Sequence, residues 1–136
     1  MKKTWPGEIN VAQIRIARPT DKLEEIKKFY GEGVGLTVAG SFKHNGYTGI
    51  MFGLPDSDYH LEFLTHEKGS PCPAPTQDNL LVFYLPDKAD IGKISARLIS
   101  MSYEPVPPEN PYWKDKGITF ADPDGWRIVL MNTNGI

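Results

Sequence analysis

The chain has 136 residues, a formal net charge of −2, and 40% hydrophobic and 24% charged residues. This composition is typical of a globular domain; it excludes the basic surface that nucleic acids require, and no apolar run is long enough to span a membrane. Cys72 is the single cysteine, which excludes an intrachain disulfide or a thiolate metal cluster. Lys2 and Lys3 are followed by Trp5 and Pro6 rather than by an apolar signal core, so we expect one cytoplasmic domain spanning residues 1–136.

The first half of the chain predicts a strand, a helix and three further strands. Polar and apolar residues alternate over 10–18, which is typical of a half-buried strand. Pro19-Thr20-Asp21 predicts a helix start with Asp21 as the N-cap and Glu24 three residues later, and the glycines at 31, 33 and 35 predict its end. Three more strands are expected near 36–42, 47–54 and 59–66, because turn residues separate these segments.

The second half repeats this order after a proline-rich stretch without periodicity, at 67–78, which predicts a linker. A strand at 80–85 leads through Pro86-Asp87 into a predicted helix. Prolines in the irregular stretch 105–113 exclude a central strand there. The last predicted strands, near 117–121 and 125–132, flank the strong turn signal Asp122-Pro123-Asp124-Gly125.

The two halves align as a sequence repeat without a gap. Pro86 lies 67 positions after Pro19, and the same offset places Gln13 on Leu80 and Glu62 on Val129. A repeated supersecondary unit explains this spacing. We therefore predict an α+β fold of two tandem βαβββ modules: module one at 9–66, a linker at 67–78 and module two at 79–132.

Both ends of this pattern resemble a known superfamily. The Pro-Thr-Asp helix start with Phe29-Tyr30 and Val34-Gly35-Leu36, and the closing turn at 122–125 with its strand, resemble the vicinal oxygen chelate proteins. These include glyoxalase I, bleomycin-resistance and fosfomycin-resistance proteins, and extradiol dioxygenases. Residues 110–113 make the chain most similar to uncharacterised bacterial members. The resemblance implies curved half-barrel sheets that pair around a cup, in a homodimer.

The resemblance also implies where a metal would bind. Metal-dependent members place ligands on the first and last strand of each module, which corresponds here to Gln13, Glu62, Leu80 and Val129. Leu80 and Val129 cannot ligate a metal, whereas Gln13 and Glu62 can. His60 shares a strand face with Glu62 but lies two residues away, a separation of about 6.6 Å. We therefore expect an incomplete metal site and no cofactor, with a divalent metal on Gln13 and Glu62 as the alternative.

An arginine is the expected replacement for the metal. Arg15 shares a face with Gln13, and Arg127 shares one with Val129, so either guanidinium could pair with the Glu62 carboxylate. Strand phase predicts the rest of a ligand-binding wall. Its candidate residues are Gln13, Arg15, Leu80, Val82, Tyr84, Arg127 and Val129, with Tyr112 and Trp113 as a lid.

Three functions follow from these residues. The first is metal-independent binding of a small molecule with an apolar body and a polar or anionic end, similar to the bleomycin-resistance branch. The second is a lyase or thiol transferase similar to glyoxalase I or the fosfomycin-resistance enzymes, with Glu62 and His60 as catalytic candidates, with or without a metal. The third is an interaction module whose cup is filled by its own side chains.

Overall fold

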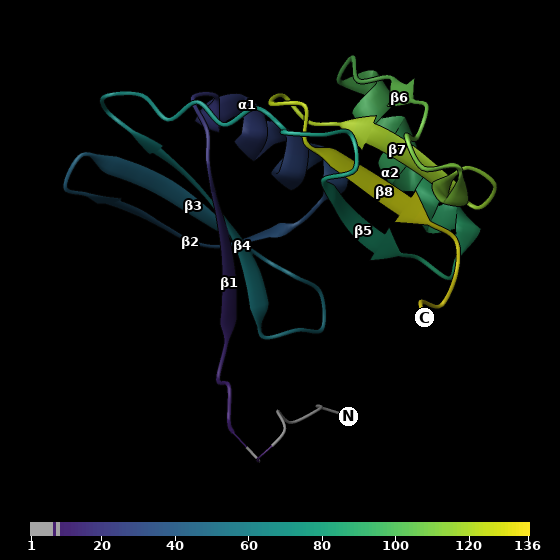
Figure 1. Cartoon of the computed structure of the whole chain (residues 1–136), viewed down its shortest axis with the longest axis horizontal. Coiled ribbons are helices and arrows are strands. Elements are labelled where there is room, and N and C mark those ends of the chain that lie inside the picture. Colours follow the sequence, from purple (N-terminus) through teal and green to yellow (C-terminus); the bar gives the residue numbers. More distant parts are fainter. Residues whose placement is uncertain (1–6, 8) are drawn as a thin grey trace.

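The computed structural model describes residue 7 and residues 9–136 as two four-stranded sheets with helices against them (Figure 1). Module one consists of β1 (Ile14–Pro19), α1 (Leu23–Lys28), the π-helical segment η1 (Phe29–Val34), β2 (Thr37–His44), β3 (Tyr47–Gly53) and β4 (Tyr59–His66). Module two consists of β5 (Leu80–Tyr84), α2 (Lys88–Ser100), β6 (Pro105–Val106), the 3-10 helix η2 (Pro111–Trp113), β7 (Gly117–Ala121) and β8 (Arg127–Met131).

The two sheets have the same topology, which confirms the predicted fold class of two βαβββ modules. The first has the strand order β1-β4-β3-β2 with β1 parallel to β4, and the second has the order β5-β8-β7-β6 with β5 parallel to β8. Residues 67–79, which connect β4 to β5, form neither helix nor strand. Pro105 falls on β6, a two-residue strand at the sheet edge, where a missing backbone N–H is tolerated, and Pro107 and Pro108 follow the strand.

Alternating residues divide each sheet into a core face and an opposite face, which we call the cup face. Leu61 and Phe63 of β4 join Ile128 and Leu130 of β8 in one buried cluster with Leu98 of α2. The intervening residues of β4 and β8 therefore lie on the cup faces. No described helix combines the length and apolar character needed to cross a bilayer.

The first helix begins one residue later than predicted, and its cap differs. Lys22 occupies the N-cap position and makes no side-chain cap hydrogen bond. The Asp21 carboxylate instead accepts a hydrogen bond from the backbone N–H of Ser70, which ties the linker to module one. The prediction that Asp21 caps the helix is therefore wrong, because a partner distant in sequence takes its carboxylate.

The structure requires glycine at two positions after α1, for a different reason at each. Gly35 ends η1 with φ +92°, a left-handed conformation that favours glycine. A Cβ on Gly33 would lie 2.4 Å from the Leu98 side chain, so its absence lets α2 approach η1 closely. The glycine-rich segment therefore lets η1 of module one pack directly against α2 of module two.

The strand register differs between the modules by two residues. Ala17 of β1 pairs with Glu62, whereas Val82 of β5 pairs with Val129. The 67-residue offset makes Tyr84 the equivalent of Ala17, so an identical register would pair Tyr84, rather than Val82, with Val129. Because side chains alternate with a period of two, this shift keeps every residue on its predicted face and moves it along the strand.

Candidate functional site

Three polar side chains meet on the cup face of module one. The Nε of Arg15 donates a hydrogen bond to His60 Nε2 at 2.9 Å, and its Nη1 lies 3.0 Å from Glu62 Oε1. The Arg15 side chain is 52% exposed, whereas that of Glu62 is 8% exposed. The ion pair to Glu62 Oε1 lacks hydrogen-bond geometry, so this buried oxygen has no hydrogen-bond donor. The cluster thus neutralises a buried carboxylate and leaves it able to accept one more hydrogen bond.

This arrangement does not suit a divalent metal. His60 Nε2 already accepts a hydrogen bond from Arg15, and the Arg15 cation contacts the only carboxylate of the cluster. No three His, Cys, Asp or Glu side chains in the described part of the chain lie close enough together to hold a metal ion. A catalytic metal typically needs three protein ligands, and these residues offer fewer.

Gln13 lies apart from this cluster. It is exposed and precedes β1, four residues before Ala17, the partner of Glu62. Four residues of extended chain cover about 13 Å, too far for both side chains to bind one ion. The structure therefore brings Glu62, His60 and Arg15 together and does not bring Gln13 to them.

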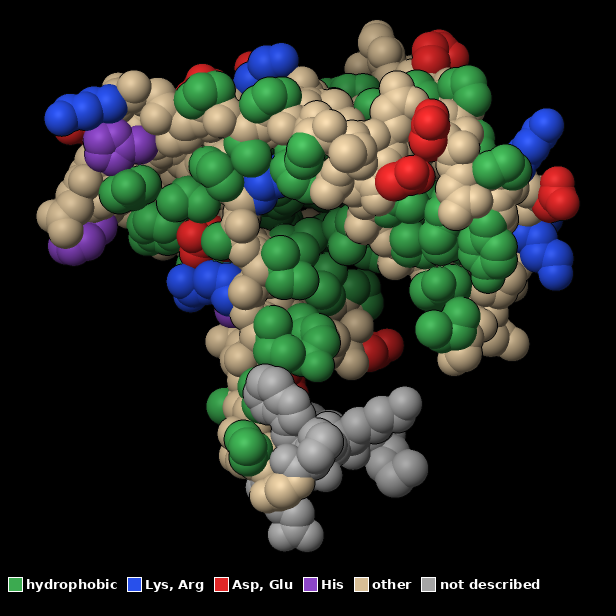
Figure 2. All heavy atoms as spheres, in the orientation of Figure 1, with side chains coloured by type: hydrophobic (Ala, Val, Ile, Leu, Met, Phe, Trp, Pro, Cys, Tyr) green, Lys and Arg blue, Asp and Glu red, His purple; other side chains and the backbone are tan. Residues whose placement is uncertain are grey.

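A pocket of about 310 Å³ lies at the seam between the two modules. Glu62 contributes from module one, and Leu80 and Arg127 contribute from module two. Hydrophobic side chains gather along this hollow (Figure 2). The lining residues are Ile16, Ala17, Arg18, Tyr30, Leu61, Glu62, Phe63, Asn79, Leu80, Leu81, Trp126 and Arg127. A mostly apolar pocket with a few polar groups is characteristic of small-molecule sites.

The remaining predicted wall of module two lies on one cup face. Leu80, Val82 and Tyr84 are half-buried, and Val129 is fully buried. Arg127 does not reach Glu62; its Nη1 donates a hydrogen bond to the Pro107 carbonyl at 2.8 Å. The predicted arginine partner of Glu62 is therefore Arg15, and Arg127 has a separate environment.

The predicted lid lies over module two only. Tyr112 is 61% exposed and packs edge-on against Trp113, with ring centroids 4.8 Å apart. A Cβ on Gly117 would lie 2.4 Å from the Trp113 carbonyl oxygen, so η2 rests directly on β7. Neither aromatic residue lines the seam pocket.

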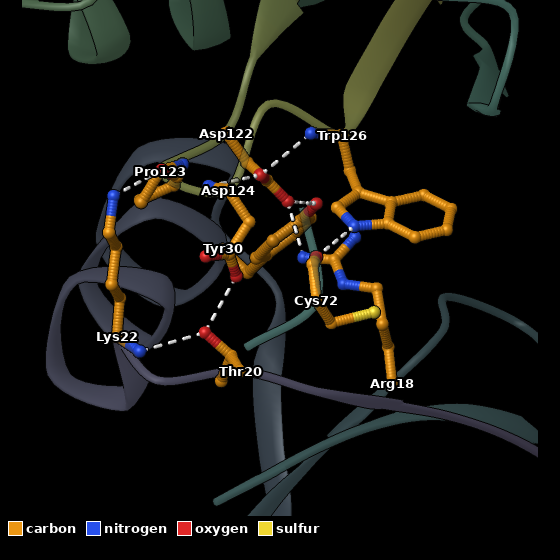
Figure 3. A network of polar contacts seen from close by, with 9 residues as sticks. All are labelled: Arg18, Thr20, Lys22, Tyr30, Cys72, Asp122, Pro123, Asp124 and Trp126. Carbon is orange, nitrogen blue, oxygen red and sulfur yellow. Dashed lines mark hydrogen bonds and ion pairs between the residues drawn. The ribbon is translucent and has the colours of Figure 1, made fainter. Parts of the chain in front are cut away.

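A buried polar network fixes the seam beside the pocket (Figure 3). Asp122 Oδ2 accepts hydrogen bonds from Arg18 at 2.5 Å and from the Tyr30 hydroxyl at 2.7 Å. Asp122 Oδ1 accepts from the backbone N–H groups of Asp124 and Trp126. Every acceptor position of this carboxylate is therefore used, and the closing turn is joined to β1 and η1.

Arg18 is held on three sides in this network. Its guanidinium carbon lies 4.8 Å from the ring centroid of Phe63 and 4.8 Å from that of Trp126, in addition to the Asp122 contact. Sequence reasoning missed Arg18, although strand phase placed this charge on the apolar face of β1. A charge in that position needs a partner, and that was the available signal.

The same environment raises the pKa of one buried group, the Tyr30 hydroxyl. Burial, followed by the nearby Asp122 carboxylate, holds the pKa of Tyr30 well above its ordinary value of 10.0. The hydroxyl therefore stays protonated and donates to Asp122.

Comparison with known proteins agrees with this geometry. Models of the YycE-like N-terminal and C-terminal domains match residues 14–64 and 78–132. The uncharacterised protein YycE of Bacillus subtilis (strain 168) is 56% identical over 131 residues, covering 96% of this chain and 94% of the relative. A YycE crystal structure from Bacillus subtilis, of unknown function, matches with a TM-score of 0.92 at 53% identity and 98% coverage of both chains.

A more distant structure shares the fold alone. The trypanothione-dependent glyoxalase I of Leishmania major matches with a TM-score of 0.69 at 18% identity, covering 90% of this chain and 87% of that one. The paired βαβββ modules and the cup define a vicinal oxygen chelate protein, as the sequence resemblance implied. Within that superfamily, the chain belongs to the YycE-like family.

Proposed function

We propose that this chain binds a small molecule in the seam pocket without a metal ion, and that the ligand has an apolar body and a polar or anionic end. The observation that carries the proposal is the Arg15–His60–Glu62 cluster beside a mostly apolar pocket of about 310 Å³. The guanidinium of Arg15 contacts both His60 and Glu62, the two groups of this cluster that could ligate a metal. Binding therefore relies on apolar contact and a few hydrogen bonds.

The same contacts disfavour a role for His60 as a general base. A base needs a free lone pair within hydrogen-bond reach of the substrate proton, and His60 Nε2 already accepts a hydrogen bond from Arg15. Glu62 keeps a free acceptor position, but its carboxylate is paired with the Arg15 cation, which favours binding a hydrogen-bond donor over taking up a proton. Binding is thus better supported than lyase or transferase chemistry.

The metal question has a direct test. EDTA-stripped protein is titrated with Mn²⁺, Co²⁺, Ni²⁺ and Zn²⁺ in a thermal-shift assay. A ligand that binds only the folded state raises stability by about 2.7 kcal/mol at one hundred times its dissociation constant. We expect no saturable rise. A saturable rise that is lost in Glu62→Ala would replace this proposal with a metal-dependent lyase or transferase.

The pocket is tested with two neutral probes, hexan-1-ol and hexanamide. We expect both to raise the melting temperature saturably, and Leu80→Arg to abolish the effect because it places a charged side chain in the pocket. Ile99→Arg is the matched control, since Ile99 is 46% exposed and lies outside the pocket lining. Equal binding by wild type and Leu80→Arg would show that the probes bind elsewhere.

We further propose that residues 1–136 form one cytoplasmic domain that assembles as a homodimer. β1 is an edge strand, and Ile16 on it is 53% exposed, with Ile9 and Val11 exposed before it. An unpaired apolar strand edge favours association with another chain. Two-fold dimers are the commonest oligomers of soluble proteins. Light scattering of the purified protein tests this, and a monomeric mass would refute it.

A further inference from the structure

Arg127 is a buried cation without a carboxylate partner. It is only 8% exposed, and its Nη1 donates to the Pro107 carbonyl. Within residues 9–136, no Asp or Glu lies within ion-pair distance of it. The other two arginines near the pocket are neutralised, Arg15 by Glu62 and Arg18 by Asp122. Burying a charge is costly unless it is paired, so Arg127 is the uncompensated positive charge at this site.

A second unpartnered polar group lies on the same cup face. Thr119 is 2% exposed, and its hydroxyl oxygen is buried without a hydrogen-bond partner. Thr119 pairs with Val129 across β7 and β8, and Ala121 pairs with Arg127. Directly paired residues point to the same side of a sheet, so the Thr119 and Arg127 side chains share one face.

Strand register also places the two groups on neighbouring strands. Val106 of β6 pairs with Thr119, and Pro107 follows it. The Arg127 side chain starts on β8 and reaches the Pro107 carbonyl beyond β6, so it crosses β7 where Thr119 lies. The same face of the second sheet thus carries a buried guanidinium and a buried hydroxyl, both of which can donate hydrogen bonds.

We propose that Arg127 and Thr119 form the anion-binding end of the ligand site, and that the ligand is an apolar molecule carrying a carboxylate or phosphonate. This inference rests on the proposed binding function, because Arg127 also lines the seam pocket beside the apolar side chains of Leu80 and Leu81. One of the five N–H groups of Arg127 bonds to Pro107, and the planar fork suits a bidentate oxyanion. The Pro107 carbonyl holds the guanidinium in place, and the other N–H groups remain available to the anion.

The test compares probes of equal length and different charge by calorimetric titration. Hexanoate and hexylphosphonate carry the anion, and hexanamide is the neutral counterpart. Hydrogen bonds between charged groups predict that both anions bind about 10-fold to 100-fold more tightly than hexanamide. Arg127→Gln should remove that preference. Lys114→Gln is the matched control; it deletes an exposed cation from the neighbouring segment and should leave all three affinities unchanged.

Thr119→Val supplies a second, independent variant. It keeps the shape of the side chain and removes the unpartnered hydroxyl, so it should weaken anion binding several-fold while the ligand-free protein is at least as stable as wild type. A loss of stability would mean that an internal water already satisfies the hydroxyl, and the anion role of Thr119 would be refuted.

The outcomes also separate this inference from the proposed function. If hexanamide binds as tightly as hexanoate, or if Arg127→Gln binds hexanoate like wild type, the anion site is refuted and the pocket stands. If anion binding is lost in Arg15→Gln instead, the anion lies on module one and the assignment to Arg127 is wrong. If hexanoate and hexylphosphonate do not bind at all, the anion site is refuted, and the neutral probes with Leu80→Arg decide the pocket separately.

Discussion

Replacing Asp122 by alanine removes the centre of the contact between the modules. The carboxylate accepts hydrogen bonds from Arg18 and Tyr30 through Oδ2, and from two backbone N–H groups of its own turn through Oδ1. Its side chain is fully buried, and that of Arg18 is 15% exposed. Asp122→Ala therefore leaves a largely buried guanidinium and a buried hydroxyl without an acceptor.

The expected cost follows from these contacts. Removing one partner of a buried ion pair costs about 3–5 kcal/mol, because the other charge remains buried. Arg18 keeps its contacts with the Phe63 and Trp126 rings, which lessens the loss. We expect Asp122→Ala to lower the free energy of unfolding by about 4 kcal/mol, a large part of the 5–15 kcal/mol that is usual for a domain. Asp122→Asn should cost about 2 kcal/mol, since its amide nitrogen faces two donors.

Urea unfolding followed by circular dichroism measures this prediction. With a slope of about 2 kcal/mol per molar urea, the midpoint of Asp122→Ala should fall by about 2 M. Asp115→Ala is the control, because Asp115 is exposed, and it should change stability by less than about 0.5 kcal/mol. If Asp122→Ala cost no more than this control, the network would not stabilise the seam.

Other predictions concern titration and two glycines. The folded state holds the Tyr30 proton more tightly than the unfolded chain, so the Tyr30 contribution to stability should be fully present below pH about 10 and be lost as the pH rises above it. In urea unfolding, Tyr30→Phe should reduce the fall in stability above pH about 10, and the raised pKa of Tyr103 should leave a remainder. An unchanged slope in Tyr30→Phe would contradict this prediction. Gly117→Ala places a Cβ 2.4 Å from the Trp113 carbonyl oxygen and should cost about 1–3 kcal/mol in the same assay. Gly92 is an exposed helix position where a Cβ would meet no atom within 4 Å, so Gly92→Ala should raise the free energy of unfolding by about 0.5–1 kcal/mol. Equal effects of the two substitutions would refute the crowding argument.

Local sequence patterns were sufficient to predict most of the fold. Alternation and turn residues located β3, β4 and β7 to within one residue, and the Pro86-Asp87 start of α2 was also correct, with Asp87 capping the helix through Ala89. These features depend on neighbours in the chain, and so they are visible in sequence. The same alternation placed Glu62 and Arg15 on one face, where the structure pairs them.

Features set by distant partners were not predictable in the same way. Alternation fixes the face of a residue but not its height along the sheet, so it did not show that Glu62 lies opposite Ala17, four residues from Gln13. The partner of Asp21 is Ser70, in the linker, and no local signal identifies it. The Asp122 turn was predicted from its proline and its glycine, whereas the role of Asp122 as acceptor for Arg18 depends on tertiary packing.

The Arg18–Asp122 contact also sets a constraint on how the chain folds. Its two residues are 104 positions apart, so during synthesis module one emerges long before the acceptor for its buried cation exists. Closing a loop of that length is entropically costly and slows folding. A nascent chain that stops before the last two strands keeps an unpaired guanidinium against Phe63. We therefore expect the first module to complete its packing only after the turn at 122–125 has left the ribosome, and the two halves of this repeat to unfold as one cooperative unit.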